Sequence, residues 1–252
     1  MIAITEITLD APLEADCNMG PMMHGFMMQC IDTEYATFLH TQNMRPYTQQ
    51  IYFDAENDCN IWQITTLTQS AYEQIILPLK TRFEHKNILR IINKKTDFCV
   101  ENIATTFGIT YEELSVGRDI KPRSPLKALI NLYTPTTFKS AGEYMLYPQI
   151  PQILNNLYNR WNSCRPDKVL CEQQQLSEII DKAKITDYHI QSRRFTVERA
   201  YIQGFCGAIK VEIRGTAEQK RIAAALLNYA NYAGLGVKTA LGMGMCSANL
   251  SE

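Results

Sequence analysis

The 252-residue chain lacks several features that would assign it at once to a broad class of proteins. It has no run of 18 apolar residues, which argues against a membrane-spanning helix. The N-terminal stretch MIAITEITLDAPLEAD has neither a basic start nor an apolar core, so we do not expect a signal peptide. We therefore expect a cytoplasmic protein with reduced thiols.

The eight cysteines and the small net charge give information on metal binding and on the kind of partner. No two cysteines form a Cys-x-x-Cys pair, and their spacing matches no zinc module, so no structural metal is expected. The net charge of −1 divides unevenly: residues 1–125 carry 10 Lys+Arg against 16 Asp+Glu (−6), and residues 126–252 carry 15 against 10 (+5). This pattern fits a polyanionic partner for the second half, or ordinary surface variation.

The first half of the chain predicts the element order β-α-β-β-α-β of a ferredoxin-like unit. An extended start over residues 2–9 precedes a helical stretch over about residues 22–39. Two strand-like runs, QQIYFD and NIWQITTLT, are separated by the polar turn AENDCN. A second helix is expected over about residues 71–80, and further extended segments follow.

The second half repeats this order. LKALINLYT is typical of a strand, and QIPQILNNLYNRWN of a helix whose Ile153, Leu157 and Trp161 recur every four residues. RRFTVERAYIQGFCGAIKVEIRG predicts two strands with Gly204 and Gly207 at bulges or close approaches. A further helix and a last strand complete the unit.

That further helix, TAEQKRIAAALLNYANYAG, has the clearest signals in the chain. Thr216 and Gln219 form a capping box at its start, and Gly234 can adopt the left-handed conformation that ends it. The predicted fold class is therefore α+β, with tandem ferredoxin-like (RRM-like, βαββαβ) domains over residues 1–122 and 123–252. The join is placed near residues 117–125, in GRDIKPRSP, because of its prolines and charges.

A glycine-rich run, GLGVKTALGMGMC, occupies residues 234–246. Phosphate loops and dinucleotide fingerprints connect a strand to the N-terminus of a following helix. This run instead follows a helix and leads into a strand, so both nucleotide-binding interpretations fail on context. Two alternatives remain: a structural turn, or a loop that accepts a long phosphate backbone, with Lys238 as its charge.

Four segments in order resemble one family. They are the glycine-rich run Gly-x-Gly-x-Lys-Thr-x-x-Gly-x-Gly, TPTTFKSAGEYMLYPQIPQILNNLYNRWN at residues 134–162, YIQGFCGAIKVEIRG at residues 201–215, and HGFMMQCIDTEYATFLHTQNMRPYT at residues 24–48. Each is weak alone, but together they resemble the CRISPR repeat-RNA processing endoribonucleases of the RAMP superfamily. That resemblance implies two ferredoxin-like domains.

The resemblance also implies an activity. Family members cut precursor CRISPR RNA within each repeat, with no metal or cofactor. The 2′-hydroxyl attacks the adjacent phosphate and leaves a 2′,3′-cyclic phosphate (or 3′-phosphate) and a 5′-hydroxyl. The expected partners are the precursor and mature RNA, possible effector-complex subunits and a possible second copy of the chain. The alternative is a catalytically inactive RNA-binding subunit of an effector complex; a small-molecule enzyme rests on fold analogy alone.

The resemblance places the catalytic histidine at His40. Asp32 or Thr33 can cap a short helix running to about Leu39, which puts His40 at the helix C-terminus, where the dipole favours a positive charge. Arg45 falls where family members place a cation that can hold the scissile phosphate.

The alternatives are a histidine that only caps the helix and a solvated loop arginine. His24 is a second candidate, as a packed helix residue or an assistant to His40. Some relatives carry a tyrosine in the first helix, where this chain has Met28; Tyr35 and Tyr47 are the alternatives for that role. His85 and His189 match nothing catalytic and are expected at the surface.

The predicted RNA-binding residues lie in the basic half. Lys238 is the preferred contact, and Lys139, Arg193 and Arg194 follow. The two adjacent arginines precede a strand and are expected to point to opposite faces. Within the glycine-rich run, the remaining predicted contacts are Gly234, Gly236, Thr239, Gly242 and Gly244. Tyr229, Tyr232 and Trp161 are expected in the core.

Overall fold

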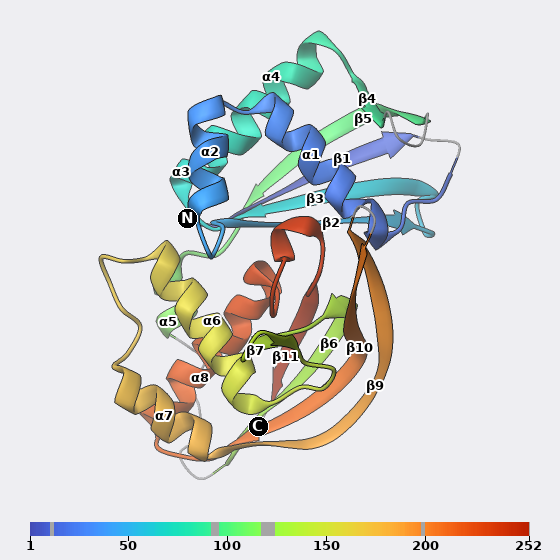
Figure 1. Cartoon of the computed structure of the whole chain (residues 1–252). Helices are drawn as coiled ribbons and strands as arrows, with labels where there is room; N and C mark the ends of the chain where they lie inside the picture. The colour runs from blue at the N-terminus through green and yellow to red at the C-terminus, as the bar shows by residue number, and fades with distance from the viewer. Residues whose placement is uncertain (11–12, 92–95, 117–123, 198–199, 252) are drawn as a thin grey trace. The chain divides into compact units, whose positions relative to one another are not determined.

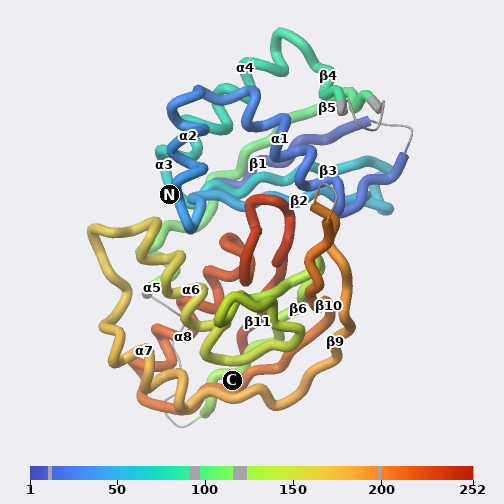
Figure 2. Tube along the Cα trace, in the orientation of Figure 1, coloured from blue at the N-terminus to red at the C-terminus, as the bar shows by residue number. Residues whose placement is uncertain are grey.

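The structure, a computed structural model, describes residues 1–10, 13–91, 96–116, 124–197 and 200–251. It divides into two compact units (Figures 1 and 2). The first contains residues 1–108 together with residues 240–242, and the second contains residues 109–239 and 243–252. The predicted join at residues 117–125 falls largely outside the described residues, so the domain limits 1–122 and 123–252 stay predictions. No helix within the described ranges is long and apolar enough to cross a membrane.

The first unit has the predicted element order with an added edge strand. Its sheet has the order β2-β3-β1-β5-β4, and the four strands β2, β3, β1 and β5 have the order of a ferredoxin-like sheet. In chain order its elements are β1 (Ala3–Asp10), η1 (Cys17–Met19), α1 (Gly20–Cys30), α2 (Thr33–Thr41), β2 (Tyr47–Asp54), β3 (Cys59–Thr66), α3 (Gln69–Ala71), η2 (Tyr72–Ile76), α4 (Leu77–His85), β4 (Ile88–Ile91) and β5 (Thr96–Phe107).

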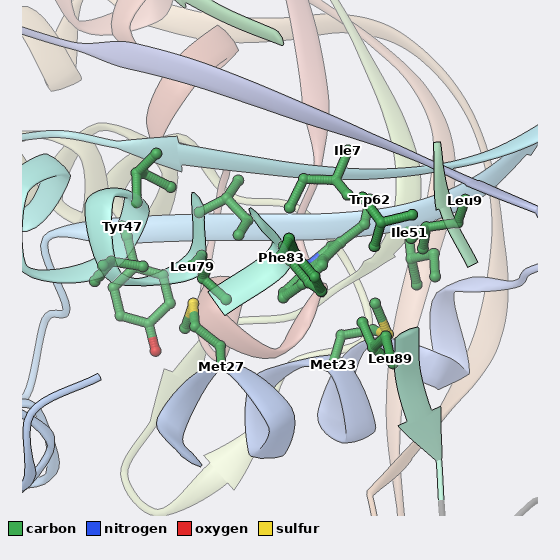
Figure 3. Close-up of a cluster of buried hydrophobic side chains, with 14 of the residues drawn as sticks. Ile7, Leu9, Met23, Met27, Tyr47, Ile51, Trp62, Leu79, Phe83 and Leu89 are labelled. Atoms are coloured by element: carbon green, nitrogen blue, oxygen red, sulfur yellow. The ribbon is translucent and has the colours of Figure 1, made fainter. Parts of the chain in front are cut away.

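The core of this unit lies between the sheet and the helices α1 and α4. Figure 3 shows Met23 and Met27 of α1 facing Trp62 and Ile51 of the sheet, with Phe83 of α4 among them. These side chains are 5% exposed or less, so water is excluded from this face. Burial of such side chains contributes about 1.5–3 kcal/mol each, which makes this layer the main source of the unit's stability.

The helical predictions in the first unit are confirmed in part. The helical stretch expected over residues 22–39 consists of two helices separated by the extended residues Ile31 and Asp32, and the short helix expected to begin at Asp32 or Thr33 is the second of them. The helix expected over residues 71–80 is part of a longer helical run, α3-η2-α4. Its middle, η2, is a π-helical segment that precedes Pro78; proline lacks the N–H that a regular turn requires.

The second unit has a ferredoxin-like sheet in the order β11-β6-β10-β9. Helix α8 packs on β11, and α6 packs on α8 (Figure 1). In chain order its elements are α5 (Tyr111–Val116), β6 (Leu126–Thr136), β7 (Lys139–Ser140), β8 (Glu143–Tyr144), α6 (Ile150–Cys164), α7 (Gln173–Asp181), β9 (Ala183–Val197), β10 (Ala200–Ile213), α8 (Ala217–Ala233), η4 (Thr239–Leu241, whose last two residues belong to the first unit) and β11 (Cys246–Ser251).

The local predictions for the second unit are largely confirmed. Thr216 and Gln219 close a reciprocal capping box at the start of α8, and Gly234 ends this helix with a φ of 66°. Gly207 lies at a bulge of β10, and Gly204 lies against the backbone of Thr136. The sequence missed α5, α7, the β7–β8 hairpin and the first ten residues of β9. Figure 2 shows how long β9 and β10 run side by side.

The core expectations for the aromatic residues hold for two of the three. Trp161 and Tyr229 are buried, and their rings lie edge to face with centroids 5.2 Å apart. Tyr111 of α5 completes this cluster, with its ring 4.8 Å from that of Trp161 and its hydroxyl 3.2 Å from that of Tyr229. Tyr232, in contrast, is only half-buried near the end of α8.

Candidate active site and nucleic-acid interface

Helix α2 presents His40 in its last turn. The Asp32 side chain accepts hydrogen bonds from the backbone N–H of Glu34 at 2.8 Å and of Tyr35 at 3.2 Å, which confirms it as the N-cap. Gln42 is extended and ends the helix. His40 is exposed, and the negative end of the helix dipole favours a positive charge at this position.

Arg45 lies against the same helix end. Its Nε donates a hydrogen bond to the Leu39 carbonyl oxygen at 3.3 Å, one of the carbonyls that a helix C-terminus leaves without an intrahelical partner. The side chain is half-buried. The contact fixes the guanidinium stem beside the residue that precedes His40 and leaves the terminal nitrogens as donors for an anion.

His24 on α1 completes this group. Its Nδ1 lies 3.0 Å from the Tyr47 hydroxyl, and the two rings are nearly parallel with centroids 6.3 Å apart. The pKa of His24 is lowered to about 4, first by burial and then by the positive charges of Arg45 and His40. These electrostatic effects show that the fold brings the three candidate catalytic residues together, although the chain separates His24 from His40 by 16 positions.

Tyr47, the first residue of β2, is the tyrosine that contacts a candidate catalytic residue. It is buried, and burial raises its pKa well above the ordinary value, so the phenol stays protonated. Tyr35 stacks instead on Phe38 along α2, with ring centroids 5.7 Å apart. Met28 is half-buried and packs against the hydrophobic core. His85 and His189 are exposed, as expected.

In chemical terms, this group provides two imidazoles and a guanidinium. A half-buried histidine with a pKa of about 4 is neutral at pH 7 and has a nitrogen lone pair. The exposed His40 supplies a second imidazole that can transfer a proton. A guanidinium beside them can stabilise negative charge on a phosphorane. This is the set that phosphodiester transesterification requires.

The glycine-rich run is tightly packed. Gly234, Gly236, Gly242 and Gly244 are all buried with positive φ. A Cβ on Gly236 would overlap the Thr137 carbonyl oxygen, and one on Gly244 would overlap that of Leu235. The glycines thus allow the backbone to pack on itself.

Two of the predicted RNA contacts in this run, Thr239 and Lys238, differ in their exposure to solvent. The Thr239 side chain is buried, so it faces the protein interior. Lys238 is exposed and has a φ of 57°, in the left-handed region. It is therefore the charged group that the run presents to solvent.

Residues 240–242 belong to the first unit. Ala240 is part of the buried core of that unit. The Gln49 amide donates to the carbonyl oxygens of Gly20 at 3.1 Å and of Ala240 at 2.8 Å. Gly20 approaches the Leu241 carbonyl so closely that a side chain would collide with it. These contacts hold the middle of the glycine-rich run in one conformation.

Lys139 and Lys238 lie on neighbouring backbone segments. The Val237 N–H donates to the Thr137 carbonyl at 3.0 Å, so the backbone just before Lys238 lies against the backbone that leads to Lys139. Lys139 is exposed at the start of the β7–β8 hairpin, and its ammonium lies 5.9 Å from the ring centre of Tyr144. Sequence reasoning missed Tyr144, because nothing in the sequence pattern pairs it with a cation.

The two predicted arginines lie on the edge strand β9. Arg193 pairs with Gly204 and Arg194 with Gln203 across the ladder, so they point to opposite faces. Both side chains are exposed. The guanidinium of Arg194 lies 4.6 Å from the ring centre of the exposed Tyr201, a second cation–aromatic pair that sequence reasoning missed.

Sequence reasoning also missed Asn156 and Arg160 on α6. The Arg160 Nη1 donates to the Ala233 carbonyl at 2.7 Å and to the Thr239 hydroxyl. The Asn156 side chain accepts from the Gly236 N–H at 2.9 Å. A signal was available: both are polar residues that directly precede members of the apolar stripe of a predicted core helix.

The comparisons with known proteins reported below are all similarities to proteins named Cas6. Residues 130–246 match the family described as CRISPR-associated endoribonuclease Cas6. A CRISPR-associated endoribonuclease Cas6 of Mycobacterium tuberculosis is 29% identical over 247 residues, covering 94% of this chain and 74% of the relative. One of Streptococcus thermophilus is 26% identical over 227 residues, covering 90% of each chain. A solved Cas6 product complex superposes with a TM-score of 0.81 at 18% identity, over 99% of this chain and all of the other.

Proposed function

We propose that the chain is a member of the family of CRISPR-associated endoribonucleases Cas6, which its residues 130–246 match, and that it cleaves precursor CRISPR RNA within its repeats. The observation that carries this proposal is the grouping of His24, His40 and Arg45 in the first unit. The relatives' printed names supply the reaction class, and this grouping supplies residues able to perform it.

The proposed reaction needs no metal and is balanced by two proton transfers. The 2′-oxygen forms a bond to the adjacent phosphorus as its proton passes to a base. The bond from phosphorus to the 5′-oxygen breaks as that oxygen takes a proton from an acid. The products are a 2′,3′-cyclic phosphate and a 5′-hydroxyl. General acid–base catalysis of this kind contributes about 10²–10⁴-fold.

We assign the acid to His40 and the base to His24. His40 is exposed at the helix C-terminus, whereas His24 is half-buried and neutral at pH 7. Arg45 holds the scissile phosphate and offsets the charge of the phosphorane. The phosphate in turn offsets the Arg45 charge that lowers the pKa of His24, so bound RNA makes His24 a stronger base.

RNA binding is assigned to the second unit. Lys238, Lys139, Arg193 and Arg194 are exposed cations, and Tyr144 and Tyr201 lie beside two of them. Cations contact the phosphate backbone, and aromatic rings stack on unpaired bases. The buried glycines and Thr239 act by shaping the run that presents Lys238. A hand-over of the product to effector subunits and a homodimer remain predictions.

One assay tests this proposal. The purified protein is incubated in EDTA with its cognate repeat RNA and with a matched RNA carrying a 2′-deoxy nucleotide at the cut site. We expect the first to be cut, with a cyclic phosphate and a 5′-hydroxyl at the new ends, and the second to stay intact. Cleavage of the deoxy RNA, or a need for metal, would contradict the mechanism. Binding without cleavage would instead support an inactive RNA-binding subunit.

A further inference from the structure

Two polar side chains one turn apart on α6 hold the glycine-rich run. The Asn156 amide oxygen accepts from the Gly236 N–H at 2.9 Å, and its nitrogen donates to the Gly236 carbonyl at 3.4 Å. Arg160, four residues later, donates through Nη1 to the Ala233 carbonyl at 2.7 Å and to the Thr239 hydroxyl. Residues i and i+4 lie on one helix face, so a single face of α6 anchors the run at Gly236 and Thr239 and the helix end before it at Ala233.

Arg160 has an unusual environment for a charged group. It is buried, and no carboxylate pairs with it in the part of the chain that the structure describes. Its neighbours are the uncharged side chains of Tyr229, Tyr111, Cys164 and Cys246, and burial lowers its pKa. Its Nε has no hydrogen-bond partner. A buried charge without a counter-ion is unfavourable, so packing alone does not explain why a guanidinium occupies this position.

The Arg160 contacts explain what the buried charge does. Ala233 is the last residue of α8, where the negative end of the helix dipole attracts a cation. The same guanidinium nitrogen reaches Thr239, beyond Lys238 in the chain. Arg160 thus ties together the two sides of the segment that carries Lys238, and Asn156 holds its middle.

The segment between these anchors has a conformation that must be imposed on it. Lys238 has a φ of 57°, and Gly234 and Gly236 have φ values of 66° and 80°. A non-glycine residue in the left-handed region is strained and persists where surrounding contacts enforce it. The hydrogen bonds from Asn156 and Arg160 are contacts of this kind.

We propose that Asn156 and Arg160 are positioning residues that hold the glycine-rich run in its RNA-binding conformation before RNA arrives, so that Lys238 already faces a phosphate. This inference rests on the proposed function, because it takes the ligand of Lys238 to be repeat RNA. Pre-ordering removes a conformational penalty from binding and adds no phosphate contact. The residues therefore affect affinity without affecting the number of counterions released.

The test compares Arg160→Met with Lys238→Ala in binding of the cognate repeat RNA over a series of salt concentrations. For Arg160→Met we expect affinity about 10- to 100-fold lower, with an unchanged slope of log affinity against log salt concentration. Lys238→Ala should instead flatten that slope by roughly 0.7, as expected for one lost phosphate contact to single-stranded RNA.

Hydrogen exchange of the backbone amides at residues 235–244, measured without RNA, reports the positioning directly. Exchange should accelerate in Arg160→Met and stay unchanged in Lys238→Ala. Should Arg160→Met fail to fold, Arg160→Lys and Asn156→Ala supply the same comparison, with Arg160→Lys recovering part of the affinity because lysine can satisfy one of the two acceptors.

The outcomes separate this inference from the proposed function. Affinity within twofold of wild type, or a slope that falls as in Lys238→Ala, would overturn the positioning role. A wild-type protein that binds the repeat without cutting it would overturn the proposed cleavage and leave the positioning role intact. A wild-type protein that does not bind the repeat would overturn both.

Discussion

The protonation of His24 gives a prediction that depends on the fold alone. Its pKa is about 4, below the ordinary 6.5, because burial and the charges of Arg45 and His40 disfavour the protonated ring. In the unfolded chain the same ring takes up a proton near pH 6.5. The unfolded state therefore binds more protons between these two values, so stability falls as the pH drops from 6.5 to 4 and is fully retained above 6.5.

The magnitude follows from the size of the shift. Each pKa unit corresponds to 1.36 kcal/mol, so a fall from 6.5 to about 4 is worth about 3 kcal/mol between neutral and acid pH. This is a large fraction of the 5–15 kcal/mol that is typical of folded proteins. His24→Leu removes the titrating group and should remove this part of the pH dependence.

The assay is urea unfolding of wild type and His24→Leu at pH 7 and pH 4.5, since the difference between the two proteins cancels carboxylates that titrate in both. His85→Gln is the matched control for loss of an imidazole, because His85 is exposed at the surface. NMR titration of the His24 ring measures the pKa directly. A midpoint near 6.5, or equal pH dependence in wild type and His24→Leu, would refute this explanation.

Three further changes test neighbouring contacts. Arg45→Gln should raise the pKa of His24 in an NMR titration, because it removes a positive charge that lowers that pKa. The same change should slow cleavage at least tenfold, because it removes the proposed phosphate ligand. An unchanged pKa of His24 would contradict the grouping of His24 with Arg45. Tyr47→Phe should lower the free energy of unfolding by about 1 kcal/mol through loss of the hydrogen bond to His24, and unchanged stability would argue against that bond. Gly236→Ala should lower the free energy of unfolding by about 2 kcal/mol or more, because φ is 80° and the Thr137 carbonyl occupies the space of a Cβ. Gly25→Ala is the control: Gly25 lies in a helix with open space around it, so this change should raise the free energy of unfolding by about 0.5–1 kcal/mol. Similar effects of the two changes in urea unfolding would refute the role of Gly236.

The predictable parts of the fold are those with a strong local signal. Thr216, Gln219 and Gly234 mark the ends of α8, and the structure confirms all three. The early part of β9, by contrast, has mostly exposed side chains on both faces, so its sequence has no alternation of apolar and polar residues to detect. The start of α2 is likewise marked by its N-cap, Asp32, which the sequence offers together with Thr33.

The sequence names candidate residues for the site, but it does not show which of them contact one another. Resemblance and helix capping single out His40, yet they do not show that His24 lies beside Tyr47, since only the packing of α1 on β2 brings these two together. The glycine-rich run left two alternatives open for a similar reason. A glycine that permits contact with RNA and one that permits contact with the protein's own backbone look the same in sequence, and Gly236 is of the second kind.

The central claim is that His40 transfers a proton during cleavage of the repeat RNA. The most direct measurement is the single-turnover cleavage rate of His40→Ala at saturating RNA, together with its affinity for the uncleaved 2′-deoxy RNA. We predict a rate lower by about 10²–10⁴-fold and an affinity within a few-fold of wild type, because His40 acts in the transition state. A rate within about threefold of wild type would contradict the assignment of His40 as the main catalyst.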